Sequence, residues 1–179
     1  SNVTPKFGLR SNPLEDLDIR LSVSNGFSLP NSTRKYEEDA DLDPTQLWQY
    51  ELGANYALSD WLELDVVGFI LDTSNEILES PPGSGDFLNI GKTRRTGIET
   101  EAIIKPSLSW KIVGTFSYTE TEVLENPDDD LIGRSVVNIP ETITTLNVSY
   151  AFKNGLGSRF TIRDVGSYYT NAENTAGYD

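Results

Sequence analysis

"TRRTGIETEAIIKPSLSWKIVGTFSYTETEV", residues 93–123, alternates apolar and polar residues on both sides of a turn that contains proline. In its second half, one set of alternate positions reads Trp110, Ile112, Gly114, Phe116, Tyr118 and the other reads Lys111, Val113, Thr115, Ser117, Thr119. Successive side chains of a β-strand point to opposite faces. The stretch therefore predicts a hairpin with one apolar face and one mostly polar face, and the polar face must meet water or a polar lumen.

The same period-two alternation recurs along the rest of the chain, whereas helical periodicity is hard to find. Alternating runs occupy residues 3–11, 17–27, 48–56, 62–78, 95–104, 110–119, 145–152 and 159–163. They predict about eight antiparallel strands, each roughly ten or more residues long. Strands of soluble proteins are shorter, at about five or six residues.

The connections between these runs alternate between short and long. The short ones are "SNPLED", "LSD", "KPSL" and "NGLG", and the long ones lie at 28–46, 79–87 and 125–137. All tight turns are thus expected at one end of the sheet and all long loops at the other. Transmembrane barrels have this arrangement, with short periplasmic turns and long extracellular loops.

Aromatic residues gather where the predicted strands end. Four lie by the short turns and five by the long loops: Tyr56, Trp61, Trp110 and Phe152, then Phe27, Trp48, Tyr50, Tyr118 and Tyr168. Amphipathic rings prefer the headgroup region, so two aromatic bands indicate two membrane interfaces. A soluble alternative remains, because lipocalin-like barrels and β-sandwiches also alternate. Such a binding module would turn its apolar face inward.

The composition restricts the possible functions. The 179 residues carry 28 Asp+Glu and 14 Lys+Arg, a net charge of −14, which argues against nucleic acid as a partner. Cysteine and histidine are absent, so thiolate metal sites, disulfides and histidine-based catalysis are excluded. We therefore expect no enzyme activity and no cofactor. We also expect the chain to begin inside a larger protein, because it starts with neither Met nor a signal peptide.

An ordered series of sequence blocks resembles the C-terminal barrel of TonB-dependent outer-membrane receptors, in particular the ferric-siderophore receptors. The blocks are "VTPKFGLR", "SNGFSLP", "LDPTQLWQYELGANYAL", "GFILDTSNEI", "LNIGKTRRTGIETE", "VVNIP" and "LNVSYAF". The resemblance implies an all-β transmembrane barrel segment in the bacterial outer membrane, belonging to a barrel of about 22 strands. It also implies TonB-coupled import of a ferric siderophore or a similar scarce ligand.

Features of the family that the sequence lacks define the expected domain. We expect residues 1–179 to be a partial barrel domain, without the plug domain, the TonB box or the last strands. The resemblance implies contact with outer-membrane lipid, and coupling to TonB only through the plug and box of the parent protein. The predicted sheet has two edge strands with unpaired backbone groups. We therefore expect neighbouring strands to pair with these edges.

Several charged residues fall on the polar set of positions and are expected to line the lumen: Arg10, Arg20, Glu51, Arg95, Glu99, Glu101 and Arg163. We expect these charged side chains to neutralise one another along the wall of the lumen, in preference to contacting substrate directly. Paired carboxylates also occur in glycosidases, but here they recur along strands with no sign of a cleft. Gly97 is expected to permit a close approach or a bend.

Recognition is expected in the loops, because loops on a rigid barrel carry binding. Arg34, Lys35 and Tyr36 form a basic and aromatic cluster in an acidic loop and could meet an anionic or catecholate ferric chelate. The acidic "NPDDDLIG" lacks the spacing of an EF-hand loop, so no metal site is predicted. Ser11 and Asp164 fall on the apolar set of positions, so either Asp164 lies near an interface or the register slips there.

Overall fold

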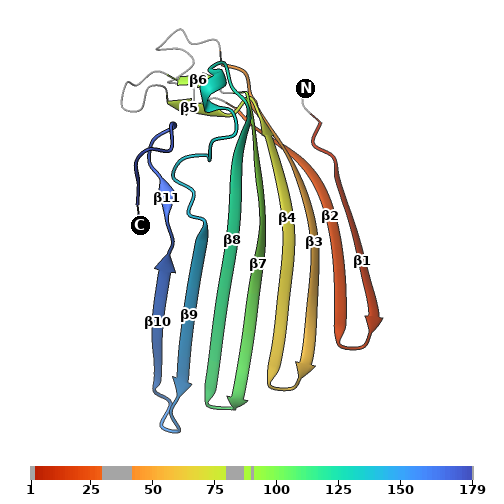
Figure 1. Cartoon of the computed structure of the whole chain (residues 1–179). Helices are drawn as coiled ribbons and strands as arrows, with labels where there is room; N and C mark the ends of the chain where they lie inside the picture. The colour runs from red at the N-terminus through yellow and green to blue at the C-terminus, as the bar shows by residue number, and fades with distance from the viewer. Residues whose placement is uncertain (1–2, 30–41, 80–86, 90, 179) are drawn as a thin grey trace.

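The long strands of the chain form one antiparallel sheet. The computed structural model describes residues 3–29, 42–79, 87–89 and 91–178. Its eight-stranded sheet has the order β1-β2-β3-β4-β7-β8-β9-β10 (Figure 1). The strands are β1 (Lys6–Leu14), β2 (Leu17–Ser28), β3 (Thr45–Ser59), β4 (Leu62–Ser74), β7 (Lys92–Ser107), β8 (Trp110–Glu125), β9 (Thr142–Ala151) and β10 (Gly157–Val165). The prediction of an all-β fold with about eight long antiparallel strands is confirmed.

Smaller elements lie beyond the loop end of this sheet. Two short hairpins pair β5 (Ile77–Glu79) with β6 (Phe87–Asn89) and β11 (Tyr168–Tyr169) with β12 (Gly177–Tyr178). A single 3-10 turn, η1 (Asp129–Leu131), follows β8. Figure 1 shows all the tight turns at one end of the sheet and the strand ends that the long connections join at the other, as the alternation of connection lengths predicts. No helix in the described part of the chain is long and apolar enough to span a bilayer.

Strand boundaries differ from the predicted ones where proline or left-handed backbone is involved. The first strand continues through Pro13 to Leu14, so the turn is shorter than the predicted "SNPLED". The register of the β1–β2 pair shifts between Ser11 and Leu14. An irregular site on an edge strand tolerates a residue without an N–H. Pro106 lies at a similar shift in the β7–β8 pair, between Ile104 and Ser107.

The fourth strand was predicted to run to residue 78 but ends at Ser74. Asn75 follows it with φ 55°, in the left-handed region that asparagine tolerates better than most residues. This backbone turn separates β4 from β5. The residues beyond it therefore form a separate hairpin with β6 instead of extending the main sheet.

The apolar face of the sheet is not covered by any other described element. The side chains of Trp48, Leu64 and Phe116 remain 40%, 36% and 40% exposed. The buried hydrophobic residues of the described ranges are only Leu42, Val123 and Val136. A soluble sandwich or lipocalin-like barrel would pack the apolar series in a dry interior. The sheet instead leaves it uncovered.

Asp164 lies on this apolar face without a slip in register, because β10 pairs continuously with β9 from Gly157 to Val165. The aromatic bands explain its position. In the register of the sheet, Tyr50 on β3 lies level with Glu120 on β8. The aromatic residue of the band on β8 is Tyr118, which lies two positions nearer the short turns. A shift of this kind is expected where strands tilt, as they do in barrels. Extended two strands further, to β10, the same shift predicts that the band lies near Asp164.

Candidate functional site

The charged residues predicted to line a lumen share the polar face of the sheet, opposite the aromatic series. Arg10 and Arg20 are direct partners in the β1–β2 register. Glu51 lies on β3, Glu99 and Glu101 on β7, and Arg163 on the edge strand β10. The polar face is therefore a wall of charges distributed over the whole width of the sheet, rather than one compact cluster.

Arg20 forms the ion pair of this wall whose partners are furthest apart in the sequence. Its Nη1 and Nη2 donate to Asp65 Oδ2 and Oδ1 at 2.8 and 2.6 Å, so the pair is bidentate. The guanidinium crosses β3 above Gly53, where an added Cβ would lie 2.9 Å from Arg20 Nε. The missing side chain at Gly53 thus provides the space through which β2 is tied to β4.

Glu51 is held by neutral donors. Ser22 Oγ and Gln49 Nε2 donate to its two carboxylate oxygens at 2.7 and 2.6 Å. Arg10 instead pairs with Asp18, which also accepts from Asn12 Nδ2 at 3.0 Å. The two carboxylates are thus satisfied by donors within the wall, Asp18 by a cation and an amide and Glu51 by neutral groups alone.

Gly97 permits a close approach on the same face. A Cβ at this position would lie 2.6 Å from Phe69 Cζ and 2.3 Å from the carbonyl oxygen of Tyr118. The ring of Phe69, on the neighbouring strand, lies over the glycine, which is its direct cross-strand partner. The glycine therefore lets an aromatic ring lie flat within a polar wall.

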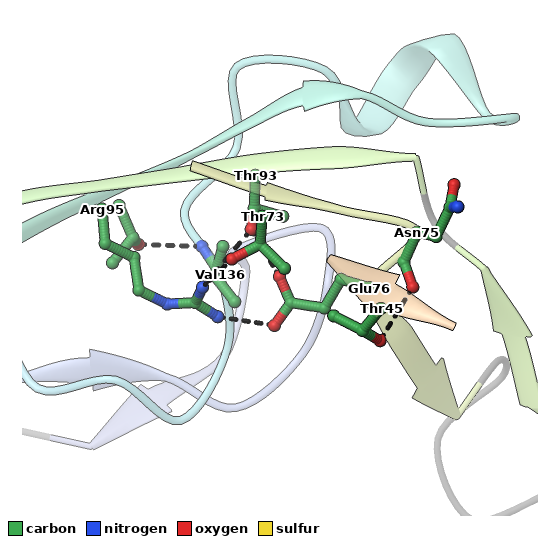
Figure 2. A network of polar contacts seen from close by, with 8 residues as sticks. Thr45, Thr73, Asn75, Glu76, Thr93, Arg95 and Val136 are labelled. Atoms are coloured by element: carbon green, nitrogen blue, oxygen red, sulfur yellow. Dashed lines mark hydrogen bonds and ion pairs between the residues drawn. The ribbon is translucent and has the colours of Figure 1, made fainter. Parts of the chain in front are cut away.

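A partly buried network closes the loop end of the polar face (Figure 2). Arg95 Nη2 pairs with Glu76 Oε1 at 2.5 Å, and the two side chains are only 17% and 15% exposed. Arg95 Nη1 donates to Thr73 Oγ1 at 3.1 Å, and the hydroxyl of Thr93 donates to the other oxygen of Glu76. Thr93 is completely buried. The network joins the ends of β4 and β7 to the residue that opens the β5–β6 hairpin.

The connection after β8 folds over this network. Its Val136 N–H donates to Thr121 Oγ1 at 2.9 Å, and Thr121 lies on the polar face of β8. The Val136 side chain is 5% exposed and belongs to the small hydrophobic core of the described residues. The Arg95 and Glu76 side chains, 17% and 15% exposed, have limited contact with water, which strengthens the electrostatic interaction between them.

The roots of the other two long connections are also fixed by hydrogen bonds. Thr45 Oγ1 and Asn89 Nδ2 both donate to the carbonyl of Asn75 at 2.9 Å. Asn89 in addition accepts from the N–H of Asp43 at 2.8 Å and donates to its carbonyl at 3.1 Å. The segment that enters β3 is therefore attached to the β5–β6 hairpin.

The segment beyond β10 clasps the β8–β9 connection. Asn174 Oδ1 accepts from the N–H of Ser135 at 2.7 Å, and Asn174 Nδ2 donates to the carbonyl of Ser135 at 3.1 Å. A backbone bond from Asn138 N–H to the Tyr169 carbonyl, at 2.8 Å, runs beside it. The two segments thus form one connected layer above the sheet.

The remaining predicted residues are less constrained. Glu99 and Glu101 are exposed and line a hollow of about 390 Å³ together with Asp65 and Thr115. Arg163 is exposed and makes no ion pair with any residue in the described ranges. The predicted loop cluster of Arg34, Lys35 and Tyr36 lies outside the described residues.

Sequence reasoning missed the partners that organise this face. Asp65, Glu76, Thr73 and Thr93 were not singled out, although the first is on the polar set of positions of its strand. The alternation assigns a face to each residue but does not say which residues of neighbouring strands lie opposite one another. Glu76 falls within the predicted strand 62–78 on the apolar set of positions, so the alternation does not indicate a role for it on the polar face.

Comparisons with known proteins identify related sequences and folds. The family model described as "TonB dependent receptor-like, beta-barrel" matches residues 1–179. The "Ferrichrome outer membrane transporter/phage receptor" of Escherichia coli (strain K12) is 30% identical over 127 residues, which make up 70% of this chain and 17% of that protein. The chain thus spans about a sixth of this relative.

Solved structures share the fold at lower identity. The siderophore receptor PiuA from Acinetobacter baumannii superposes with a TM-score of 0.73 at 19% identity, over 96% of this chain and 27% of that one. The ferric preacinetobactin receptor BauA from Acinetobacter baumannii superposes with a TM-score of 0.74 at 20% identity, over 97% and 27%. Both chains are several times longer than this one.

Proposed function

Because this chain belongs to the family of TonB-dependent receptor-like β-barrels, we propose that it is part of an outer-membrane receptor that imports a ferric siderophore or a similar scarce ligand. The family is one of receptors and transporters rather than enzymes. The described sheet supplies a section of the barrel wall, and its long connections supply part of the extracellular surface. The proposed location is the bacterial outer membrane.

The uncovered apolar face is the observation that carries this proposal. An exposed series of apolar side chains that runs across all eight strands of the sheet would cause aggregation in water. Lipid tails satisfy it without any further protein layer, and the aromatic rings at both ends match the two headgroup regions. Trp110 and Tyr150 pack with ring centroids 4.7 Å apart at the short-turn end. Trp48 and Tyr50 stack at 6.5 Å at the loop end.

The same observation weighs against the soluble alternative. A lipocalin-like or sandwich binding module would bury the series that contains Leu64 and Phe116, but both side chains are more than a third exposed. Its outer face would also carry the charged rows, which here include the bidentate Arg20–Asp65 pair. The arrangement favours a barrel with a polar interior and an apolar exterior.

In the proposed mechanism the chain performs binding and positioning, with no covalent chemistry. Extracellular loops capture the ferric chelate, and a plug domain elsewhere in the parent protein closes the lumen. TonB, driven by the proton gradient of the inner membrane, rearranges the plug to admit the ligand. The polar face described above lines the route, and its internal ion pairs neutralise the wall so that a charged chelate is not held too tightly.

Within this scheme we propose two roles for charged groups. The internally paired residues Arg10, Arg20, Glu51 and Arg95 stabilise the wall. Arg34, Lys35 and Tyr36 remain the proposed contact for an anionic or catecholate chelate, because cations and aromatic rings suit such ligands. No metal or cofactor is proposed for this segment itself.

The domain boundary is also a proposal. β1 and β10 each pair with only one strand within the described ranges, and unpaired strand edges are not stable in lipid. We therefore propose that further strands of the parent protein continue the sheet on both sides and close a barrel of about 22 strands.

Binding measurements on the full-length parent protein test the function. Purified protein in detergent is titrated with a panel of ferric siderophores, with haem and cobalamin as controls, by quenching of tryptophan fluorescence. We expect one class of ferric chelate to bind tightly and the two controls to bind weakly. Failure to bind any ferric chelate would remove the iron assignment, and a protein that stays monodisperse without detergent would remove the membrane assignment.

A further inference from the structure

A large hollow lies at the short-turn end of the sheet, away from the loops. It has a volume of about 950 Å³ and is lined by residues near the turns that join β3 to β4, β7 to β8 and β9 to β10. Three cations line it, Lys105, Lys111 and Arg159, together with Trp61 and a single carboxylate, Asp60. A hollow with an excess of positive charge stands out in a chain whose net charge is −14.

The three cations form a row across the sheet. Lys111 lies opposite Ser149 on β9, and Ser149 lies opposite Arg159 on β10. Lys105 lies near the end of β7, where its N–H donates to the carbonyl of Trp61 at 2.7 Å. Lys111 and Arg159 are on the polar face of their strands, while Trp110 and Tyr150, which also line the hollow, are on the apolar face.

The row lacks the ion pairing found for five other cations. Arg10, Arg20, Lys92, Arg94 and Arg95 each form an ion pair with a carboxylate, whereas Lys6, Arg134, Lys153 and Arg163 form none within the described ranges. Within the described ranges Lys105, Lys111 and Arg159 form none, even with Asp60, and all three are exposed. The Arg159 Nε–H donates only to Ser149 Oγ, at 3.4 Å. Their charges are available to a partner.

The spacing of the row indicates the shape of that partner. Three steps between neighbouring strands separate β7 from β10, a distance of about 14 Å. A single phosphate or a small carboxylate is too short to reach all three cations. An extended peptide places alternate side chains about 7 Å apart on one side, so carboxylates at positions i, i+2 and i+4 span about 14 Å. The strand of Lys111 lies about 5 Å from β7 and about 10 Å from β10, and the long, flexible lysine side chain covers the difference of about 2 Å from the middle carboxylate.

From this match we infer that the short-turn end of the polar face docks an extended acidic peptide segment, with carboxylates at alternating positions that pair with Lys105, Lys111 and Arg159. The peptide lies across the strands at the mouth of the lumen, with Trp61 at one end of the site. The inference rests on the proposed function only for the orientation of the sheet in the membrane. If the short turns face the periplasm, a polypeptide reaches the row from that side.

The test uses the full-length parent protein in detergent and a fluorescent synthetic peptide in which glutamate alternates with threonine. Binding is followed by fluorescence anisotropy at low and at moderate salt. The first comparison peptide carries the same three glutamates in succession, and the second carries glutamine instead. The double variant Lys111→Gln/Arg159→Gln removes two charges of the row, and Lys92→Gln/Arg134→Gln is the matched control at the loop end. A third double variant, Lys111→Arg/Arg159→Lys, keeps both charges.

We expect the alternating peptide to bind the parent protein and to lose at least tenfold in affinity with the first double variant. The loop-end control and the charge-keeping variant should stay within about twofold, and moderate salt should weaken binding. No binding to the parent protein, or equal binding to the first double variant, would overturn the inference. So would equal affinity for the consecutive glutamates with displacement by inorganic phosphate, which would indicate a small-anion site.

A competition experiment with lipid vesicles tests the remaining alternative, which is that the row binds lipid headgroups. If vesicles containing phosphatidylglycerol compete with the peptide as well as the unlabelled peptide does, the row binds lipid headgroups and the inference is wrong. The proposed function is judged separately, by the binding of ferric siderophores to the same preparations. Loss of peptide affinity in a variant that still binds the siderophore would support the docking site by itself.

Discussion

Arg20 reaches Asp65 across the whole width of strand β3, and it does so directly above Gly53. The pair joins β2 to β4, which are not neighbours in the sheet. Its side chains are 41% and 25% exposed, so water screens the attraction and the pair contributes modestly to stability. Its main effect is to fix the orientation of charge on the polar face.

The first prediction concerns this crossing. Gly53→Ala should destabilise the protein by about 1 kcal/mol, because the new Cβ meets the Arg20 side chain and displaces it. Gly114→Ala is the matched control, since a Cβ there has no heavy atom within 4 Å. The free energy of unfolding is measured by urea denaturation of the full-length protein in lipid vesicles. In an Arg20→Ala background the difference between the two alanine variants should disappear, and its persistence would contradict the crossing.

The second prediction concerns the buried network at the loop end. Thr93→Val keeps the shape of a fully buried side chain but removes the hydroxyl that donates to Glu76. We expect a loss of about 1–2 kcal/mol, because the Glu76 carboxylate loses a donor and Arg95 Nη1 loses its 3.4 Å hydrogen bond to Thr93 Oγ1 in a partly buried site. Thr100→Val, on the apolar face, removes only a long hydrogen bond to the Phe116 carbonyl, at 3.4 Å, and should be neutral or stabilising. Hydrogen exchange should show faster opening at Ile77 in the first variant alone.

Equal exchange in the two threonine variants would mean that the network does not hold the β5–β6 hairpin. A further comparison within this network is Glu76→Gln. It keeps the shape but leaves the Arg95 guanidinium without a charged partner. The loss should then exceed that of Thr93→Val, because an uncompensated charge in a partly buried position costs more than a missing hydroxyl.

The third prediction tests which face meets lipid. Val66 and Val67 are consecutive residues of β4, and the first lies on the apolar face while the second lies opposite Glu99 on the polar face. Val66→Arg should destabilise the protein by about 2–4 kcal/mol, the cost of a basic residue facing the middle of the bilayer. Val67→Arg should cost about 1 kcal/mol or less, since it gains a carboxylate neighbour. The reverse order in vesicle unfolding experiments would reject the assignment of faces.

These cases explain how much of the molecule could be predicted from the sequence. Alternation assigned Val66 outward and Glu99 inward, because a period of two is a local property of each strand. The pairing of Arg20 with Asp65 could not be predicted, since sliding one strand by two residues keeps both faces and changes every partner. Pro13 and Pro106 suggested turns, but irregular pairing absorbs them within the strands.

The loop end was the least predictable part of the site. Glu76 joins the network only because Asn75 adopts φ 55° and redirects the chain after β4. Val136 covers the network from a connection some 40 residues further along, about which alternation says nothing. Long-range contacts between irregular segments have no periodic signal in a single sequence.

The fourth prediction concerns Asp164. Tilt of the strands places this residue at the level of the aromatic band near the loops, so its carboxylate reaches the headgroup region. Asp164→Leu should change the free energy of unfolding by less than about 1 kcal/mol, because charges near the interface cost little. Ile162→Asp, one step deeper on the same face of β10, should destabilise by about 1–2 kcal/mol. Equal effects of the two changes in vesicles would show that the bands do not mark the interface.

The fifth prediction concerns the clasp between the last segment and the β8–β9 connection. Asn174 combines a left-handed backbone, φ 55°, with two hydrogen bonds to Ser135, so a pair of substitutions separates the two contributions. Asn174→Gly keeps the backbone freedom and loses only the side-chain bonds, which should cost about 1 kcal/mol. Asn174→Ala loses the bonds and also strains the backbone, adding about 1 kcal/mol more. Hydrogen exchange at the Ser135 amide should therefore accelerate in both variants and more in the alanine variant. Unchanged exchange in both would mean that the two segments move independently.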